Sequence, residues 1–275
     1  MKYLVTSATG DLAFQSVQFL VDLVGKEQVI ATARSLEKAQ PLRDLGVDVR
    51  QADYLDKESL IQAFTGIDRV LFVSSGDLET REQQHRNVIE ALQTAGVSFV
   101  AYTSAPNAQD STALVAPDHK VTENLIKESG LEYAFLRNNW YLENEGALLE
   151  AIAAKRPFTY SAGEGKTAWA KKQDYAEAAA RILANVAPQK TIYELGGTPL
   201  TYPELAALLQ HDQTEKIELI ATTDEEYASQ LTEIGLPKDA IGFIIGIQKD
   251  IREGQLDVDS QDLPNVLGHP LTPFN

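Results

Sequence analysis

The stretch Met1–Ala13, MKYLVTSATGDLA, decides the fold that the rest of the chain continues. Its apolar start, Tyr3–Thr6, has the composition of a short strand, and the apolar periodicity of Leu12–Val24 predicts a helix. This strand–turn–helix order is typical of α/β proteins that bind the pyrophosphate of a dinucleotide, because free backbone N–H groups at the start of the helix favour an anion. The stretch therefore predicts a dinucleotide-binding α/β protein.

The glycine fingerprint of this turn is incomplete. A full pattern has glycine at 7, 10 and 13, whereas this chain has Ser7, Gly10 and Ala13. Ser7 brings a Cβ atom to a place where backbone approaches phosphate or where φ is positive, although its hydroxyl can donate to an anion. Asp11 suits the dipole of the helix but repels a pyrophosphate if it points inward. We therefore expect cofactor affinity to depend on where these two side chains point.

The rest of the first half alternates strands with helices, which implies a parallel sheet covered by helices on both faces. The expected strands are Tyr3–Thr6, Val29–Thr32, Val47–Arg50, Val70–Ser74, Phe99–Thr103 and Tyr133–Leu136, and the expected helices are Leu12–Val24, Leu36–Leu45, Lys57–Phe64, Arg81–Ala95 and Asp118–Ser129. Gly96 and Gly130 follow two of these helices as stop signals.

After Arg137 the alternation ends. We expect helices at Glu145–Ala154 and Asp174–Asn185, the latter capped near Asp174, a loop region at Pro157–Lys172, a strand at Thr191–Leu195, and a helical end. The predicted fold is α/β, a Rossmann-like doubly wound parallel sheet with a smaller, mostly helical C-terminal substrate lobe. The expected division is 1–137 for the dinucleotide-binding domain, joined by the elements around 174–197, and 138–173 with 198–275 for the lobe.

The composition excludes several classes of function. The formal net charge of −16 argues against nucleic acid as a partner, because phosphate contacts need clustered Lys and Arg. The chain has no cysteine, which excludes disulfides and thiol catalysis, and its four histidines lie too far apart for a metal site to be expected. No apolar run is long enough for a membrane span or the core of a signal peptide, so we expect a cytoplasmic protein with no membrane partner.

Polar side chains follow every expected strand, and the carboxyl ends of parallel strands meet at one edge of a sheet, where ligands bind. Arg34 decides the type of cofactor, because it places a cation where NAD would need an acidic residue to bind its ribose hydroxyl. Together with Lys38 it favours a 2′-phosphate, and thus NADPH over NADH; the alternative is an arginine that only faces solvent. The polar residues are Ser7–Asp11, Arg34, Ser35, Lys38, Asp53, Ser74, Ser75, Thr103, Ser104 and Arg137–Tyr141.

Motifs spread in order over nearly the whole chain resemble the NmrA-like, atypical short-chain dehydrogenase group. The resemblance is greatest to its NADPH:quinone oxidoreductase and triphenylmethane reductase branch. The matching segments are Arg50–Tyr54, Gln84–Ile89, Ala101–Ser104, His119 with Thr122 and Glu123, Leu136–Asn138, Trp140–Tyr141, Glu143–Asn144, Gly163–Lys166, Asp174–Ala176, Tyr193–Leu195 and Leu267–Pro270.

The resemblance implies NADPH laid across the strand ends and assigns residues to its parts. It implies a quinone-like acceptor in a pocket beside the nicotinamide. The implied residues are Ser7, Thr9, Gly10, Asp11 and Leu12 at the pyrophosphate, Arg34 at the 2′-phosphate, Asp53 and Tyr54 near the adenine, Ser74 and Ser75 along the ribose and pyrophosphate, Ser104, His119 and Arg137 near the nicotinamide, and Asn138, Trp140 and Tyr141 around the quinone.

One motif of typical short-chain dehydrogenases is missing. Their Tyr-x-x-x-Lys tyrosine protonates a carbonyl, but here Val115 stands in the tyrosine position and His119 in the lysine position. A simple ketone yields a strongly basic alkoxide, whereas a quinone yields a delocalised anion that needs much less protonation. The sequence therefore disfavours alcohol dehydrogenase and sugar epimerase chemistry. His119 is expected to anchor the nicotinamide ribose or to supply a later proton; the alternative is a structural hydrogen bond.

The function predicted from the residues and the resemblance is NADPH-dependent hydride transfer to quinones or similar electron-poor rings, with His119 and Ser104 as the catalytic candidates. A rival is a non-catalytic sensor of NADP(H) that reports to a protein partner, which the incomplete glycine loop favours. A sugar-nucleotide epimerase ranks last, because it needs the missing tyrosine. A protein partner or a homodimer stays open.

Overall fold

The centre of the fold is a parallel sheet of seven strands within residues 1–274, the part of the chain that the computed structural model describes. The strand order is β3-β2-β1-β4-β5-β6-β8, and the direction of winding reverses between β1 and β4. Ligands bind at such a reversal, beyond the carboxyl ends of the strands. The strands are β1 (Tyr3–Val5), β2 (Val29–Ala33), β3 (Asp48–Gln51), β4 (Arg69–Phe72), β5 (Phe99–Ser104), β6 (Glu132–Asn138) and β8 (Ile192–Leu195).

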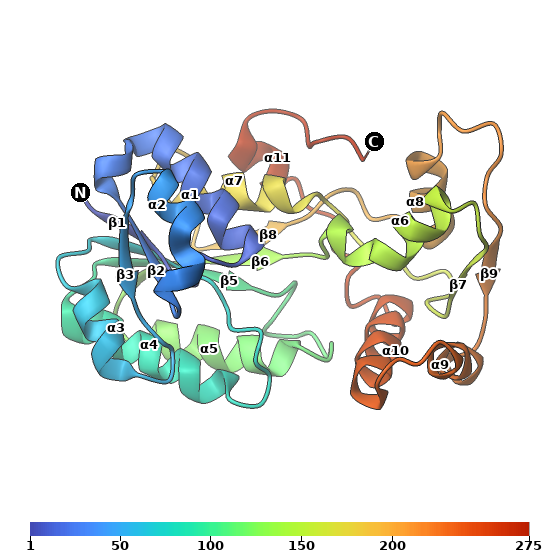
Figure 1. The fold of residues 1–275 in the computed structure, drawn as a ribbon, viewed down its shortest axis with the longest axis horizontal. Helices are drawn as coiled ribbons and strands as arrows, with labels where there is room; N and C mark the ends of the chain where they lie inside the picture. The colour runs from blue at the N-terminus through green and yellow to red at the C-terminus, as the bar shows by residue number, and fades with distance from the viewer. Residues whose placement is uncertain (275) are drawn as a thin grey trace.

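Helices cover both faces of this sheet, which confirms the predicted doubly wound fold (Figure 1). On one face α1 packs on α7 and α7 on α11; on the other, α3 packs on α4 and α4 on α5. Their apolar sides form two buried layers, one around Val17 and Tyr175 and one around Phe64 and Leu92. The helices are α1 (Asp11–Val24), α2 (Gln40–Asp44), α3 (Lys57–Phe64), α4 (Arg81–Ala95), α5 (Ala116–Glu128), α7 (Lys172–Leu183) and α11 (Asp262–Leu267), with 3-10 turns η1 (Lys26–Gln28) and η2 (Leu36–Ala39).

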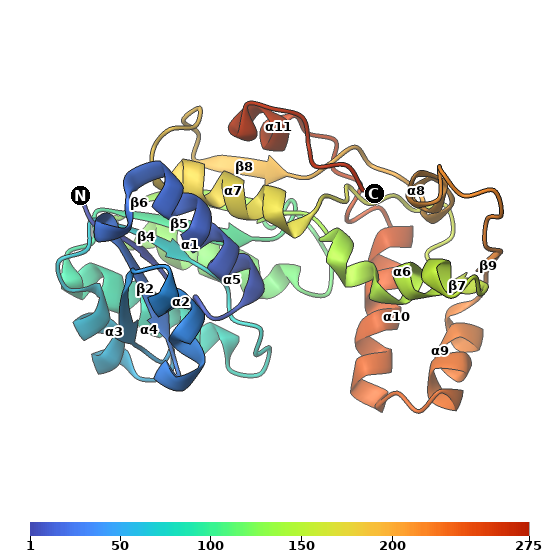
Figure 2. The same cartoon turned by 45° about the horizontal axis from the view of Figure 1, so that its top comes forward.

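The remaining elements gather at one end of the molecule (Figures 1 and 2). They have a core of their own, in which Trp169, Tyr202 and Ile251 are almost completely buried. The expected domain boundaries stay a prediction. These elements are η3 (Leu142–Glu145), α6 (Gly146–Ala153), β7 (Phe158–Tyr160), α8 (Tyr202–Leu209), β9 (Leu219–Ala221), α9 (Asp224–Glu233) and α10 (Lys238–Arg252).

The structure corrects three local predictions. The expected loop region 157–172 contains β7, which pairs in parallel with β9, a partner about sixty residues away that local sequence does not reveal. The expected helix 36–45 is divided into η2 and α2, because Pro41 has no N–H for a helical bond. The cap expected at Asp174 is wrong: α7 begins at Lys172, and the buried Asp174 carboxylate accepts hydrogen bonds from Thr272. Among the described residues, no helix has the length and apolar character needed to cross a membrane.

Candidate active site

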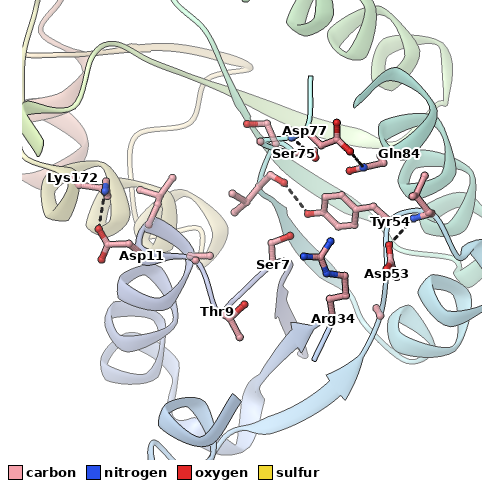
Figure 3. Close-up of a pocket in the computed structure, with 18 of the residues that line it drawn as sticks. Ser7, Thr9, Asp11, Arg34, Asp53, Tyr54, Ser75, Asp77, Gln84 and Lys172 are labelled. Carbon is pink, nitrogen blue, oxygen red and sulfur yellow. Dashed lines mark hydrogen bonds and ion pairs between the residues drawn. The ribbon is translucent and has the colours of Figure 1, made fainter. Parts of the chain in front are cut away.

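A cleft of about 650 Å³ lies beyond the carboxyl ends of β1, β2 and β4, at the reversal of the sheet; we call it the outer cleft (Figure 3). It brings together most of the residues that the sequence assigned to the cofactor. Lys38 is exposed on η2 and does not line the cleft. The predicted residues that do line it are Ser7, Thr9, Gly10, Asp11, Leu12, Arg34, Asp53, Tyr54, Ser74 and Ser75.

The turn between β1 and α1 offers unpaired backbone donors to this cleft. Ser7 has a φ of 51°, in the left-handed region that costs a non-glycine residue about 1–2 kcal/mol. Gly10 is the N-cap of α1 and provides no side-chain hydrogen bond. The N–H groups of Asp11, Leu12 and Ala13 therefore lack partners within the helix, and these residues line the cleft. Such a group of N–H donors suits an anion.

The Asp11 carboxylate is paired, which settles where it points. Its Oδ2 atom lies 2.7 Å from Nζ of Lys172, at the start of α7, and its Oδ1 accepts a hydrogen bond from Gln15 (Figure 3). These two hydrogen bonds, with that of Lys172 the stronger influence, lower the pKa of Asp11 despite partial burial. Lys172 thus neutralises the charge that we expected to oppose a pyrophosphate.

Arg34 stands at the rim of the outer cleft with its side chain exposed. Its guanidinium forms no ion pair with another of residues 1–274, so its donors face solvent and the cleft. Tyr54 is placed differently: it is buried, and its hydroxyl donates to the carbonyl of Val73. Tyr54 therefore ties the loop after β3 to the end of β4 as well as lining the cleft.

A smaller cavity of about 240 Å³ continues inward; we call it the inner cavity. Ser74, Tyr141 and Asn144 line both spaces, so the two adjoin. Elements from the sheet and from α10 form its walls. The predicted residues that line it are Ser104, His119, Asn138, Trp140 and Tyr141, with Val115. It is also lined by Arg81 and Asp250, to which the sequence assigned no role.

His119 is neutral in this cavity. Burial, with the nearby Arg81 guanidinium as a further cause, lowers the pKa of His119 to about 3. Its Nδ1 atom lies 2.8 Å from the hydroxyl of Tyr102, whose own pKa is raised by burial. We therefore assign the proton of this contact to the phenol, which places the ring N–H of His119 on Nε2.

A second buried histidine, His85, fixes the backbone at the end of β4. Its Nε2 accepts a hydrogen bond of 2.9 Å from the N–H of Ser75, and its Nδ1 therefore donates to Oγ1 of Thr122 at 2.8 Å. Burial is the main cause that lowers the pKa of His85 to about 3, followed by repulsion from a protonated His119 and from Arg81. His85 thus holds Ser75 at the border of the outer cleft.

Arg137, which the resemblance implies near the nicotinamide, lines neither space. It is buried, and its guanidinium forms two hydrogen bonds with Glu123, of 2.8 and 2.9 Å, and a third with Glu194, of 2.8 Å. Burial opposes the ionisation of Glu123, but hydrogen bonds from Arg137, Gln109 and Ser104 outweigh it and lower the pKa of this carboxyl. These contacts hold the Arg137 guanidinium between two carboxylates, and its place near the nicotinamide stays a prediction.

The Asn138 side chain leaves an acceptor for a ligand. Its Nδ2 donates to the hydroxyl of Tyr141, but its buried Oδ1 has no hydrogen-bond partner within residues 1–274. A buried amide oxygen without a partner costs about 1–3 kcal/mol, and a ligand donor in the inner cavity would relieve that cost. Ser104 has no such spare capacity as a donor, since its hydroxyl donates to Glu123.

Several polar residues that line these spaces received no role from the sequence. Among them are Lys172 in the outer cleft, Asn144 in both spaces, and Arg81 and Asp250 in the inner cavity. Asn144 lies in Glu143–Asn144, one of the segments that match the NmrA-like group, so the sequence could have indicated a role for it. Arg81 begins a predicted helix just before another such segment. Lys172 and Asp250 follow no expected sheet strand, so only the tertiary structure places them.

Comparisons with known proteins agree with this geometry. Residues 7–185 match the model of a family described as NAD(P)H-binding. The chain is 37% identical to quinone oxidoreductase 2 of Escherichia coli, over 98% of this chain and 94% of the relative. The solved structure of the E. coli NADPH-dependent quinone oxidoreductase complexed with NADPH has a TM-score of 0.93 at 36% identity, covering 99% of this chain and 96% of that one.

A second solved structure, of Citrobacter sp. triphenylmethane reductase complexed with NADP(H), has a TM-score of 0.92 at 33% identity, covering 99% of this chain and 97% of that one. The family match spans more than half of the chain, and the E. coli relative aligns over nearly all of it. The NmrA-like resemblance of the motifs is thereby confirmed. The chain belongs to the NAD(P)H-binding family.

Proposed function

We propose that this chain transfers a hydride from NADPH to quinones. The observation that carries the proposal is the inner cavity, which adjoins the outer cleft through the shared residues Ser74, Tyr141 and Asn144. A ring bound in the inner cavity lies beside the end of a dinucleotide bound in the outer cleft. The similarity to the E. coli quinone oxidoreductase supports this substrate class.

The outer cleft suits NADPH, which supplies a hydride when bound. The unpaired N–H groups at the start of α1 would hold the pyrophosphate, and Arg34, with no ion pair to another described residue, would hold the 2′-phosphate. Asp53 and Tyr54 would border the adenine. Ser74 and Ser75 would follow the ribose and pyrophosphate.

The inner cavity favours an acceptor that needs no strong acid. Val115 lines it at the tyrosine position of related dehydrogenases, and the neutral His119 is too weak a base to carry a proton at neutral pH. The phenol of Tyr141 also lines the cavity, but burial raises its pKa to about 12. This phenol accepts a hydrogen bond from Asn138 and keeps its own proton for donation to a ligand, but it does not readily release that proton. A quinol anion tolerates such surroundings, whereas a simple alkoxide does not.

The size of the cavity limits the acceptor further. Its volume of about 240 Å³ lies below the roughly 300–1,000 Å³ that is typical of pockets for drug-sized ligands. We expect acceptors of one or two rings. The neutral N–H of His119 and the unpaired oxygen of Asn138 provide one donor and one acceptor for orienting them or the nicotinamide.

The test is NADPH oxidation with a panel of one- and two-ring quinones, beside simple ketones of similar size. We expect turnover with quinones, none with ketones, and no titration of kcat near the ordinary pKa of histidine, because His119 stays neutral. Robust ketone reduction would overturn the proposal. NADPH binding without turnover of any quinone would instead favour the non-catalytic sensor.

A further inference from the structure

Arg81 is a buried cation that faces the acceptor site. It begins α4, it is 7% exposed, and it lines the inner cavity beside His119. Its Nε donates to the carbonyl of Ser75 at 2.8 Å, and its Nη1 lies 3.4 Å from the carboxylate of Asp118. Its Nη2 forms no hydrogen bond with another of residues 1–274. The guanidinium is thus held in place by two contacts and keeps donors for a ligand.

Three carboxylates lie around Arg81, and each is either screened by solvent or holds another hydrogen-bond donor. Asp118 is partly exposed and 3.4 Å is a long contact, so solvent screens this pair. Glu123 is committed to Arg137. Asp250 lines the cavity from α10, and its carboxylate accepts a hydrogen bond from the N–H of Leu114. Burial is the main cause of the lowered pKa of His119 and of His85, and the positive charge of Arg81 is a further cause for both.

Resting on the proposed function, we propose that Arg81 binds the carbonyl oxygen of the acceptor and selects acceptors by charge. It favours neutral quinones, which become anionic on reduction, over acceptors that are cationic at the start. A guanidinium fork with a spare Nη2 donor is well suited to an oxygen that gains charge in a site with little water. Arg81 is therefore a catalytic residue and a determinant of specificity.

The chemistry balances without any further reactant. The quinone accepts a hydride, with both its electrons, from C4 of the dihydronicotinamide, whose C–H bond breaks as the ring becomes pyridinium. The hydride forms a new O–H bond at one carbonyl oxygen of the quinone. The electron pair of that carbonyl moves through the ring, which becomes aromatic, and the negative charge arises on the opposite oxygen, the anion that Arg81 contacts. A proton from solvent then neutralises this oxygen after release. A triphenylmethane dye is a cation that becomes neutral on accepting the same hydride, so no anion forms for Arg81 to stabilise.

The experiment compares wild type with Arg81→Met in NADPH-dependent reduction of a one-ring quinone and of a cationic triphenylmethane dye. We expect kcat/KM for the quinone to fall at least about tenfold, and that for the dye to stay equal or to rise. Arg81→Lys should keep part of the preference for quinone, because it keeps the charge. Arg86→Met is the matched control: Arg86 is on the same helix and pairs with Glu82, but it does not line the cavity.

A loss of general structure lowers the rates with both acceptors, so an equal fall for quinone and dye would overturn the proposal. Binding provides a readout that does not depend on turnover. The protein saturated with NADP⁺ is titrated with 2,4-dinitrophenolate, a one-ring anion that imitates the quinol anion. Arg81→Met should weaken this binding at least about fivefold, and Arg86→Met should leave it unchanged. Unchanged phenolate affinity in Arg81→Met rejects the role of Arg81, whereas a wild type that binds phenolate but reduces no quinone rejects the proposed function alone.

Discussion

The outer cleft and the inner cavity adjoin, but they are built by different means. The outer cleft uses backbone N–H groups and charges that reach solvent, such as Arg34 and the pair Asp11–Lys172, in which the Asp11 side chain is 60% exposed. The inner cavity uses buried polar side chains with fixed partners, such as His119 and Asn138. Solvent screens charges in the outer cleft and so reduces the free-energy cost of substituting them. It does not screen the buried side chains around the inner cavity.

This difference explains how the chain tolerates an incomplete glycine fingerprint. The carboxylate of Asp11 is offset by a lysine from another helix, and the left-handed Ser7 costs no more than a small part of the stability of a domain. No such compensation is available to a charge that is buried behind the inner cavity. We therefore expect substitutions in the buried network of Arg137, Glu123 and Glu194 to have the largest effects on stability or affinity, and substitutions at the outer cleft to have smaller ones.

The largest effect is expected from Arg137→Met. It leaves the fully buried carboxylate of Glu123 without its cation, and breaking a buried pair in this way costs about 3–5 kcal/mol. Urea unfolding at neutral pH measures the change. Arg156→Met is the matched control, because Arg156 and its partner Glu150 are both exposed, and it should change the stability by less than about 0.5 kcal/mol. Similar losses in the two variants would mean that the network contributes no more than a surface pair.

The same pair predicts a dependence on pH. In the wild type the folded pKa of Glu123 is lowered, so its contribution to stability is present above the pKa of the unfolded chain and is lost as the pH falls through the folded pKa. In Arg137→Met the buried carboxyl protonates readily, which removes the penalty in acid. The difference between the two proteins should therefore shrink below about pH 5.

The second effect concerns the cofactor. Arg34→Glu should weaken the binding of NADPH by about 30-fold or more and change the binding of NADH much less, because an attraction for the 2′-phosphate becomes a repulsion. Fluorescence titration of both nucleotides measures this. Lys38→Glu makes the same change of charge four residues away, outside the cleft, and should have a small effect on either nucleotide. Equal losses for NADPH and NADH in Arg34→Glu would remove Arg34 from the phosphate site.

The sequence predicted the sheet and the position of the outer cleft because both follow from local patterns. Alternating strands and helices imply parallel strands, and parallel strands bring the residues after their carboxyl ends to one edge. Ser7, Arg34 and Asp53 meet in the cleft for this reason. The prediction rested on topology and needed no knowledge of side-chain packing.

The rest could not be predicted because it depends on pairs that are distant in the chain. Arg137 was expected near the cofactor because it follows the expected strand Tyr133–Leu136 and because of the family resemblance. In the structure its guanidinium is the centre of a buried network with Glu123 and Glu194. Lys172 is 161 residues from the Asp11 that it neutralises. A residue at the correct edge of a sheet is thus a candidate, and its side-chain partners decide its role.

The third effect is a coupling between Asp11 and Lys172. Lys172→Met should weaken the binding of NADPH about two- to fivefold, because it exposes the pyrophosphate to the unpaired carboxylate of Asp11. The double variant Lys172→Met with Asp11→Asn should recover most of this affinity. The coupling should diminish at high salt, because the pair is partly exposed. If instead Lys172→Met weakens NADPH equally with Asp11 or Asn at position 11, Lys172 acts on the cofactor directly and not through Asp11.

The smallest effect separates backbone strain from phosphate binding. Ser7 and Lys155 both have a φ of 51°, but Ser7 lines the outer cleft and Lys155 lies exposed after α6. Glycine relieves about 1–2 kcal/mol of strain at either site and costs part of this through the freedom it gives the unfolded chain. Ser7→Gly and Lys155→Gly should therefore stabilise the protein by similar amounts, about 0.5–1 kcal/mol, in thermal or urea unfolding.

Only Ser7→Gly should also tighten the binding of NADPH, by about threefold, because backbone can then approach the pyrophosphate more closely. Weaker NADPH binding in Ser7→Gly, with the same gain in stability, would show that the Ser7 hydroxyl donates to the phosphate and that serine is adapted to this loop.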